Sequence, residues 1–441
     1  MACNVTNSYC CLPTPKGADP KFPLISFCSP QYNQSDYVGS IPDVVPNNWG
    51  RGGSRGWPGA PTWSSAYVII PATVLQYGHD VPLVQKHYEG IAAHVDFLAR
   101  QAGYGDGVPQ FGMLGDWCSV ETFCPGSSDT CLSTPGWTSG DATSAFYYIL
   151  DLQAMVQMAY AIGKHTDVTK YEAAVLRAKE AYRQVFFNSS SNDFGPTQTG
   201  NVLGILATST VDTIYGAVER LVQNLRARSG HLSTGAVGTR WILQALTHAN
   251  RSGDALDLAT QTSAPSWAWF TKNGPGTLHE NWPTGPTPDG TTGGSQCHPM
   301  FGGGIDPWIY HEVGGVRPPP AGEPVHFGVD PVIMRRVLAA SVRTKLYGSD
   351  VASSWRYDPA SHTLLYNCTV PVGVKAQLVL RAETGRRVEW LWESGAMVWS
   401  VASAQPNDST DVAGVGIAIS ETPSELRVPL GAGAYAFATK L

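Results

Sequence analysis

The chain has 441 residues and a formal net charge of −6 at pH 7, and only 15% of its residues are charged. This length allows two or three domains, and the charge balance provides no basic surface, which excludes nucleic acid as an expected partner. No apolar run is long enough to span a membrane. The cysteines form no Cys-x-x-Cys pair, so we expect no structural metal site and no cofactor.

Residues 1–62 form an irregular segment rich in Cys, Pro and Gly. Four cysteines crowd this segment and three more lie in a Gly- and Ser-rich loop, which predicts disulfides in both places and an oxidising compartment. These two groups are Cys3, Cys10, Cys11 and Cys28, and Cys118, Cys124 and Cys131. We expect Cys368, in an apolar strand, to remain a free thiol.

Six Asn-x-Ser/Thr sequons are compatible with secretion and glycosylation. They begin at Asn4, Asn33, Asn188, Asn250, Asn367 and Asn407. Residues 1–25 lack the apolar core of a signal peptide, so we expect either a cleaved precursor or a start within a longer protein. The sequence therefore predicts an extracellular glycoprotein.

Residues 63–317 show the spacing of a helical domain. An apolar stretch at Ala142–Gly163 predicts a buried inner helix, whereas Asp167–Phe187 has one apolar stripe and predicts an outer helix. Further helices are predicted over 64–77, 81–100, 211–228, 234–250, 253–263 and 305–313. Alternating inner and outer helices favour an α/α toroid, with an irregular helical bundle as the alternative.

Residues 321–441 follow a run of three prolines and are predicted to be mostly strands. After a short helix-like stretch at Asp330–Leu346, alternating apolar residues predict an antiparallel β-sandwich. The predicted strands are 363–370, 376–381, 387–392, 415–420, 426–429 and 434–438. Ionisable groups do not gather here, so we assign this domain no chemistry.

The chemistry is expected in the stretch Thr277–Tyr310. Glu280 lies between His279 and Trp282, and His298 follows in a Gly-rich run. A carboxylate can act as a general base and an indole can stack on a sugar ring, so this combination suits carbohydrate chemistry. The alternative is a solvated glutamate beside tryptophans that only pack.

This stretch, Thr-x-x-Glu-x-Trp followed by Ser-x-x-His-x-x-Phe-Gly and Trp-x-Tyr, resembles the catalytic-base segment of the α-L-rhamnosidases of glycoside hydrolase family 78. Four further motifs resemble that family in the same order. They are Pro61-Thr-Trp-Ser-Ser-Ala-Tyr67 with Tyr77-Gly-His-Asp80, Gly115-Asp-Trp117, Leu232-Ser-Thr-Gly-Ala-Val-Gly-Thr239 and Pro265-Ser-Trp267. The resemblance implies a six-hairpin α/α barrel that hydrolyses terminal α-L-rhamnosides with inversion.

For the site, the resemblance implies that Glu280 is the general base. It also points to a set of residues that bind the carbohydrate substrate: Trp63, Asp116, Trp117, His279, Trp282 and His298. An inverting reaction needs a second carboxyl group, which acts as the general acid. The family's Asp-Glu-Arg-x-Gly-Trp-Thr-Gly-Asp segment, which carries that acid, is absent, and Ser64-Ser65 stand where the family has Gly-Asp.

Four alternatives remain open. Asp116 or Glu121 could replace the missing acid, although the resemblance favours substrate binding for Asp116. A second chain or a missing N-terminal segment could complete the barrel, because the chain has fewer predicted helices than six hairpins require. The protein could also be a carbohydrate-binding relative without turnover, or another inverting α/α-barrel glycosidase that acts on uronic acid or arabinose sugars.

Overall fold

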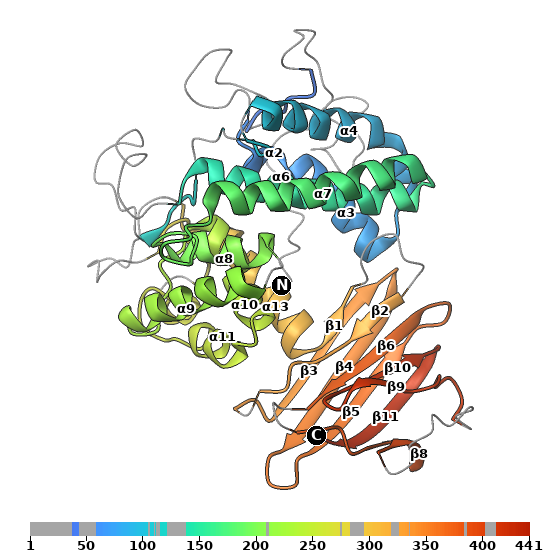
Figure 1. Ribbon diagram of the computed structural model, residues 1–441. Coiled ribbons are helices and arrows are strands. Elements are labelled where there is room, and N and C mark those ends of the chain that lie inside the picture. Colours follow the sequence, from blue (N-terminus) through green and yellow to red (C-terminus); the bar gives the residue numbers. More distant parts are fainter. Residues whose placement is uncertain are drawn as a thin grey trace. The chain divides into compact units, whose positions relative to one another are not determined.

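The computed structural model describes residues 38–43, 59–104, 106–109, 111, 115–120, 138–208, 211–273, 276–282, 295–318, 326–334, 336–382, 386–401 and 412–441. Contacts divide the chain into two compact units (Figure 1). The helical unit comprises Met1–Thr73 and Val81–Ile305, and the sandwich unit comprises Val74–Asp80 and Asp306–Leu441. The division therefore assigns residues 306–317 to the sandwich unit, whereas the sequence analysis placed them in the helical domain.

The helical unit is built from hairpins of consecutive helices. The pairs α6–α7, α8–α9 and α10–α11 pack together, and α4, α6, α8 and α10 also contact one another in series. The helices are α2 (Pro61–Ser64), α3 (Ala66–Gly78), α4 (Val81–Tyr104), α6 (Gly140–Ala161), α7 (His165–Phe186), α8 (Gln198–Ala207), α9 (Val211–Ala227), α10 (Ala236–His248), α11 (Ser252–Ala259), α12 (Trp267–Asn273), η3 (Pro299–Phe301) and α13 (Gly302–Trp308). This alternation of inner and outer helices confirms the expected α/α arrangement.

Burial distinguishes the inner helices from the outer ones. Helix α6 is buried on nearly all sides, and the Ser139 hydroxyl accepts a hydrogen bond from its first turn. In contrast, α7 buries only one stripe and exposes its charged side chains to solvent. Both helices thus take the roles that their sequence patterns predict.

Helices α8 and α12 were not predicted. Gly200 and Gly204 lower the helix propensity of α8, but the packing requires both, because a Cβ atom at Gly200 would lie 2.5 Å from the Phe194 carbonyl oxygen. A Cβ atom at Gly204 would lie 2.1 Å from the ring of Phe194. The Thr197 hydroxyl caps the helix by accepting a hydrogen bond from the Gly200 amide over 2.9 Å.

The sandwich unit contains two sheets with the strand orders β1-β2-β6-β10-β9 and β3-β4-β5-β11-β7-β8. All pairs are antiparallel except β2 with β6. The π-helix η4 (Ile309–Val313) precedes the strands β1 (Val316–Arg317), β2 (His326–Val329), β3 (Ala339–Leu346), β4 (Ser349–Asp358), β5 (Thr363–Val370), β6 (Lys375–Arg381), β7 (Trp390–Glu393), β8 (Ala396–Ser400), β9 (Ile419–Thr422), β10 (Glu425–Leu430) and β11 (Gly433–Lys440). The predicted antiparallel β-sandwich is confirmed, apart from that one parallel pair.

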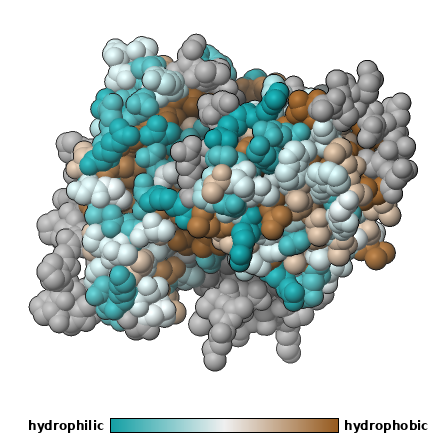
Figure 2. Space-filling view, turned by 90° about the horizontal axis from the view of Figure 1, so that it is seen from below, coloured by the Kyte–Doolittle hydropathy of each residue, from teal (hydrophilic) through white to brown (hydrophobic). Residues whose placement is uncertain are grey.

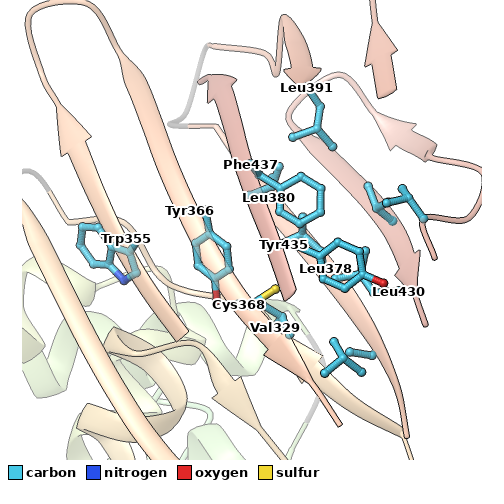
Figure 3. Packing of buried hydrophobic residues seen from close by; sticks show 14 of the residues in the cluster. Val329, Trp355, Tyr366, Cys368, Leu378, Leu380, Leu391, Leu430, Tyr435 and Phe437 are labelled. Carbon is cyan, nitrogen blue, oxygen red and sulfur yellow. The ribbon is translucent and has the colours of Figure 1, made fainter. Parts of the chain in front are cut away.

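The sandwich core consists of side chains that point inward from its strands (Figure 3). Leu378 of β6 and Tyr366 of β5 are both fully buried there. Cys368 is buried in β5 as a free thiol, as expected, and burial raises its pKa to about 12. The prediction of a helix-like stretch at 330–346 is wrong, because residues 339–346 form strand β3, which pairs with β4.

The surface mixes polar and apolar residues. Hydrophilic and hydrophobic side chains are interspersed over the face seen in Figure 2. None of the helices within the described ranges is both long and apolar enough to cross a membrane.

Candidate functional site

Two stretches of the chain pair to hold Glu280. The amide of Glu280 donates to the Ser295 carbonyl over 2.8 Å, and the amide of His298 donates to the Leu278 carbonyl over 2.8 Å. These bonds cross between the two stretches in the manner of a short antiparallel pair. The pairing therefore places Glu280 and His298 on two neighbouring extended stretches, although they lie 18 positions apart in sequence.

The carboxylate of Glu280 is oriented by the same pairing. The amide of Ser295 donates to Glu280 Oε2 over 3.0 Å. The glutamate side chain is half-buried, so it is both fixed and accessible. A half-buried carboxylate with one oxygen held by an amide can accept a proton on its other oxygen, as a general base must.

The loop that contains Trp117 lies beside this carboxylate. Burial, followed by the negative charges of Glu280 and Asp116, raises the pKa of Cys118 to about 12. Cys118 is a free thiol with a positive φ of 59°, so it takes no part in the disulfide expected in this loop. Cys124 and Cys131, the other cysteines of that prediction, lie outside the described residues.

His279 and Trp282 do not line the site, contrary to expectation. Both are buried, with exposed fractions of 0% and 3%. His279 packs against the ring of Phe270, with the centroids 5.0 Å apart, and burial lowers its pKa. Trp282 stacks on Phe301 with the ring centroids 4.1 Å apart, and its Nε1 atom donates a hydrogen bond to the Thr234 carbonyl over 2.9 Å. The two residues therefore belong to the core that supports Glu280.

His298 is held in one orientation. Its Nδ1 atom accepts a hydrogen bond from the amide of Met300 over 3.3 Å, at the start of η3. In the neutral ring the proton is then on Nε2, which leaves Nε2 as a donor. The side chain is half-buried, so His298 is suited to donate a hydrogen bond to a ligand beside Glu280.

The structure also corrects the substrate-binding role that was predicted for Asp116. Its carboxylate is buried and accepts hydrogen bonds from the Thr199 hydroxyl and from three amides at the start of α10. These amides belong to Gly235, Val237 and Gly238, at 2.7, 2.9 and 3.0 Å. Burial raises the pKa of Asp116, and these bonds oppose that rise. Asp116 thus fixes the Trp117 loop to α10, and its oxygens face protein donors instead of a substrate.

Replacing Asp116 by Ala should destabilise the helical unit. The change leaves buried amides at the start of α10 without their acceptor, which typically costs about 2–4 kcal/mol. Urea unfolding followed by circular dichroism measures the loss. The control is Asp254→Ala in the first turn of α11, where the aspartate pairs with Arg251 but is part-exposed. Equal losses for the two variants would contradict the anchoring role of Asp116.

The glycines of the Leu232–Thr239 motif allow this close contact. A Cβ atom at Gly235 would lie 2.2 Å from the Trp117 carbonyl oxygen, and one at Gly238 would lie 2.1 Å from Thr199 Oγ1. The amide of Ala236 donates to the same Trp117 carbonyl over 2.7 Å. The motif therefore lets the Trp117 loop approach the start of α10.

We expect Gly235→Ala to destabilise the protein by about 1–3 kcal/mol, the usual cost of overpacking. The Trp117 loop must then move away from the start of α10. The matched control is Gly253→Ala in α11, where a Cβ atom meets nothing within 4 Å and the change should be neutral or stabilising. Thermal unfolding of both variants checks the prediction, which fails if Gly235→Ala is as stable as the control.

The remaining predicted site residues form no hydrogen bond with Glu280 among the described residues. Trp63 is half-buried on α2, and no hydrogen bond or ring contact joins its side chain to Glu280 within the described residues. Trp117 is half-buried in the loop beside Glu280. Glu121 lies outside the described residues. Sequence reasoning missed the role of the Ser295 amide, which holds the Glu280 carboxylate, because a backbone donor leaves no signal in residue type.

Comparisons with known proteins agree on one family. The family model described as bacterial α-L-rhamnosidase 6 hairpin glycosidase domain matches residues 29–313. An α-L-rhamnosidase of Streptomyces avermitilis is 27% identical over 393 residues, which cover 83% of this chain and 34% of the relative. One from Formosa agariphila is 23% identical over 364 residues, covering 81% of this chain and 37% of the relative. The chain thus spans about a third of the length of these curated relatives.

Solved structures support the same fold. The α-L-rhamnosidase of Dictyoglumus thermophilum matches with a TM-score of 0.74 and 24% identity, covering 95% of this chain and 43% of the other. The Streptomyces avermitilis α-L-rhamnosidase complexed with L-rhamnose matches with a TM-score of 0.70 and 22% identity, covering 95% of this chain and 36% of the other. The fold is therefore an α/α toroid followed by a β-sandwich.

Proposed function

The chain belongs to the bacterial α-L-rhamnosidase six-hairpin glycosidase family, and on this premise we propose that it hydrolyses terminal α-L-rhamnosides with inversion. One observation supports this most: Glu280 lies on a stretch that pairs with the stretch of His298, its carboxylate is held by the Ser295 amide, and its charge acts on Cys118 in the Trp117 loop. This is the carboxylate that the family resemblance assigns as the general base.

In the proposed reaction, Glu280 takes a proton from a water molecule on the face of the sugar opposite the leaving group. Because Ser295 occupies Oε2, the proton goes to Oε1. The water oxygen bonds to the anomeric carbon while the glycosidic bond breaks, and the leaving oxygen takes a proton from a general acid. A single displacement from the opposite face inverts the configuration.

The carbohydrate is proposed to contact the half-buried residues of the site. The Nε2 atom of His298 donates to a sugar hydroxyl, and Trp63 and Trp117 offer indole faces to the apolar side of the ring. His279 and Trp282 stabilise the Glu280 segment from behind and contribute no contact with the sugar. This assignment replaces the wider set of binding residues that the resemblance alone implies.

The general acid is proposed to come from outside the motifs that this chain shares with the family. Asp116 does not suit the role, because its carboxylate already accepts four hydrogen bonds from the protein. Glu121 is the candidate within the chain, and a second chain that completes the barrel is the alternative. An inverting pair lies roughly 6.5–9.5 Å apart, so the acid must lie across the sugar from Glu280.

A panel of chromogenic substrates with one leaving group tests the substrate class. We expect release of the chromophore from the α-L-rhamnoside and much slower release from α-L-arabinosides and glucuronides. The names of the relatives support rhamnose over these sugars. Faster turnover of an arabinoside or a glucuronide would replace the proposal by the corresponding alternative. Saturable binding of rhamnose without any turnover would make the protein a carbohydrate-binding relative.

We also propose an extracellular location, from the sequons and the cysteines near the N-terminus. Of the six sequons, Asn188, Asn250 and Asn367 lie among the described residues, and all three are exposed. Mass spectrometry of the non-reduced secreted protein should find glycans at these positions and disulfides among Cys3, Cys10, Cys11 and Cys28. Only free thiols and unmodified asparagines would count against the location.

A further inference from the structure

The short helix α2, which carries Trp63, is held at both ends by carboxyl groups from other parts of the chain. The amide of Ala60, just before the helix, donates to Asp43 Oδ1 over 2.6 Å. The hydroxyl of Ser65, just after it, donates to Asp151 Oδ2 of α6 over 2.6 Å. Trp63 therefore lies between two anchors, one on each side of a helix of four residues.

From this arrangement we propose that Asp43 is a positioning residue: its ionised carboxylate holds the start of α2 and thereby sets the orientation of Trp63 toward the sugar. The sugar contact of Trp63 rests on the proposed function. The hold of Asp43 on the helix rests on the structure alone. Nothing in the family motifs quoted above involves Asp43.

Asp43 can act as an anchor because its own segment is attached to α4. Gly39 has a φ of +92°, and a Cβ atom there would lie 2.0 Å from the Ala93 carbonyl oxygen. The Gly39 carbonyl contacts Nδ1 of buried His94 over 2.9 Å, and Arg100 donates to the carbonyl of Val38. The segment is thus fixed on a long helix, so a change at Asp43 is transmitted to α2 instead of being absorbed locally.

The two anchors differ in their response to pH. Burial raises the pKa of Asp43 to about 6, against the hydrogen bond from Ala60. Burial raises the pKa of Asp151 well above its usual value, against the hydrogen bond from Ser65. Asp43 is the anchor whose carboxyl group ionises near pH 6.

Two ionisable side chains of α4 form hydrogen bonds with this segment. His94 faces it from α4, and burial lowers the pKa of His94 to about 4, so the ring is neutral. Arg100, also on α4, carries its charge throughout.

The sign of the effect follows from the hydrogen bond. An ionised carboxylate accepts from an amide about twice as strongly as a neutral carboxyl group does. Protonation of Asp43 below about pH 6 therefore loosens the start of α2, and ionisation above it tightens the contact. The stability of the fold depends on pH in the opposite direction. The raised pKa of Asp43 stabilises the folded state at low pH, and this contribution is lost as the pH rises through that pKa.

The test uses the full chain labelled with 5-fluorotryptophan. The ¹⁹F resonance of Trp63, assigned with Trp63→Phe, should shift between pH 5 and 8 with a midpoint near 6. In Asp43→Asn, whose amide oxygen can still accept from Ala60, the resonance should stay constant and match that of the wild type at low pH. Asp151→Asn is the matched control at the other anchor and should keep the wild-type titration.

The functional part is tested with L-rhamnose. We expect the wild-type Kd to rise about three- to tenfold from pH 7.5 to pH 5, and Asp43→Asn to bind weakly at both pH values. A Trp63 resonance that does not titrate in the wild type, or that titrates equally in Asp43→Asn, overturns the inference. A resonance that titrates as expected without any rhamnose binding supports the role of Asp43 and contradicts the proposed function.

Discussion

Glu280→Gln should abolish the turnover of α-L-rhamnosides while leaving the fold intact. The amide keeps the shape of the side chain, and its oxygen can still accept the hydrogen bond from the Ser295 amide. It cannot take a proton from water at neutral pH. The loss of a general base typically lowers kcat by about 10²- to 10⁴-fold, and KM for the substrate should change little.

The control for this variant is Glu172→Gln, the same chemical change at an exposed position on the outer helix α7. Both variants should unfold at the wild-type temperature, and only Glu280→Gln should lose activity. Steady-state kinetics on a chromogenic rhamnoside gives the comparison. Near-wild-type kcat in Glu280→Gln would remove Glu280 from the mechanism and, with it, the assignment of the site.

The second large effect concerns the leaving group. A chain that lacks the family's acid segment should hydrolyse 2,4-dinitrophenyl α-L-rhamnoside, because that phenolate departs without a proton. It should be slower on methyl α-L-rhamnoside by at least the 10²- to 10⁴-fold that general acid catalysis typically contributes, beyond the intrinsic difference between the two substrates. The intrinsic difference is measured from the uncatalysed rates at the same pH.

Glu121→Gln provides the matched variant for this experiment. If Glu121 supplies the proton, the wild type should accelerate the hydrolysis of both substrates to a similar extent over the uncatalysed rates. The variant should then lose activity on methyl α-L-rhamnoside and keep its activity on the dinitrophenyl substrate. If the proton comes from another chain, the variant should behave like the wild type. If the wild type and Glu121→Gln both accelerate the two substrates equally, a general acid other than Glu121 is present in the chain, which would contradict its absence.

Much of the fold was predictable because its signals are local. The apolar surround of α6 and the single stripe of α7 distinguish an inner helix from an outer one without further information. Helix α8 was missed because its glycines serve contacts with Phe194, which only the tertiary structure reveals. Strand β3 was missed because its pairing with β4 overrides a sequence that also suits a helix.

The site was predictable in part. The motif located Glu280 and His298, which the structure places on paired stretches. It did not distinguish their neighbours, because His279 and Trp282 lie in the same motif yet face the core. Residue type alone gives no indication of which way a side chain in an irregular stretch points.

Asp116 illustrates the same limit from another side. The Gly115-Asp-Trp117 triplet resembles a family motif and so predicts a polar contact with the ligand, because a carboxylate can accept hydrogen bonds from hydroxyl groups. The structure uses it instead to accept the amides at the start of α10, which lie more than a hundred residues away in sequence. Such a distant partner has no local signal, so the correct role follows only from the fold.

The stereochemistry of the first product tests the central claim most directly. Proton NMR during hydrolysis of 2,4-dinitrophenyl α-L-rhamnoside by the full chain should show β-L-rhamnose first, with the α-anomer growing in by mutarotation. Glu280→Gln should release rhamnose about 10²- to 10⁴-fold more slowly than the wild type. Initial release of α-L-rhamnose by the wild type would require a double displacement and would contradict Glu280 as the base of an inverting hydrolysis.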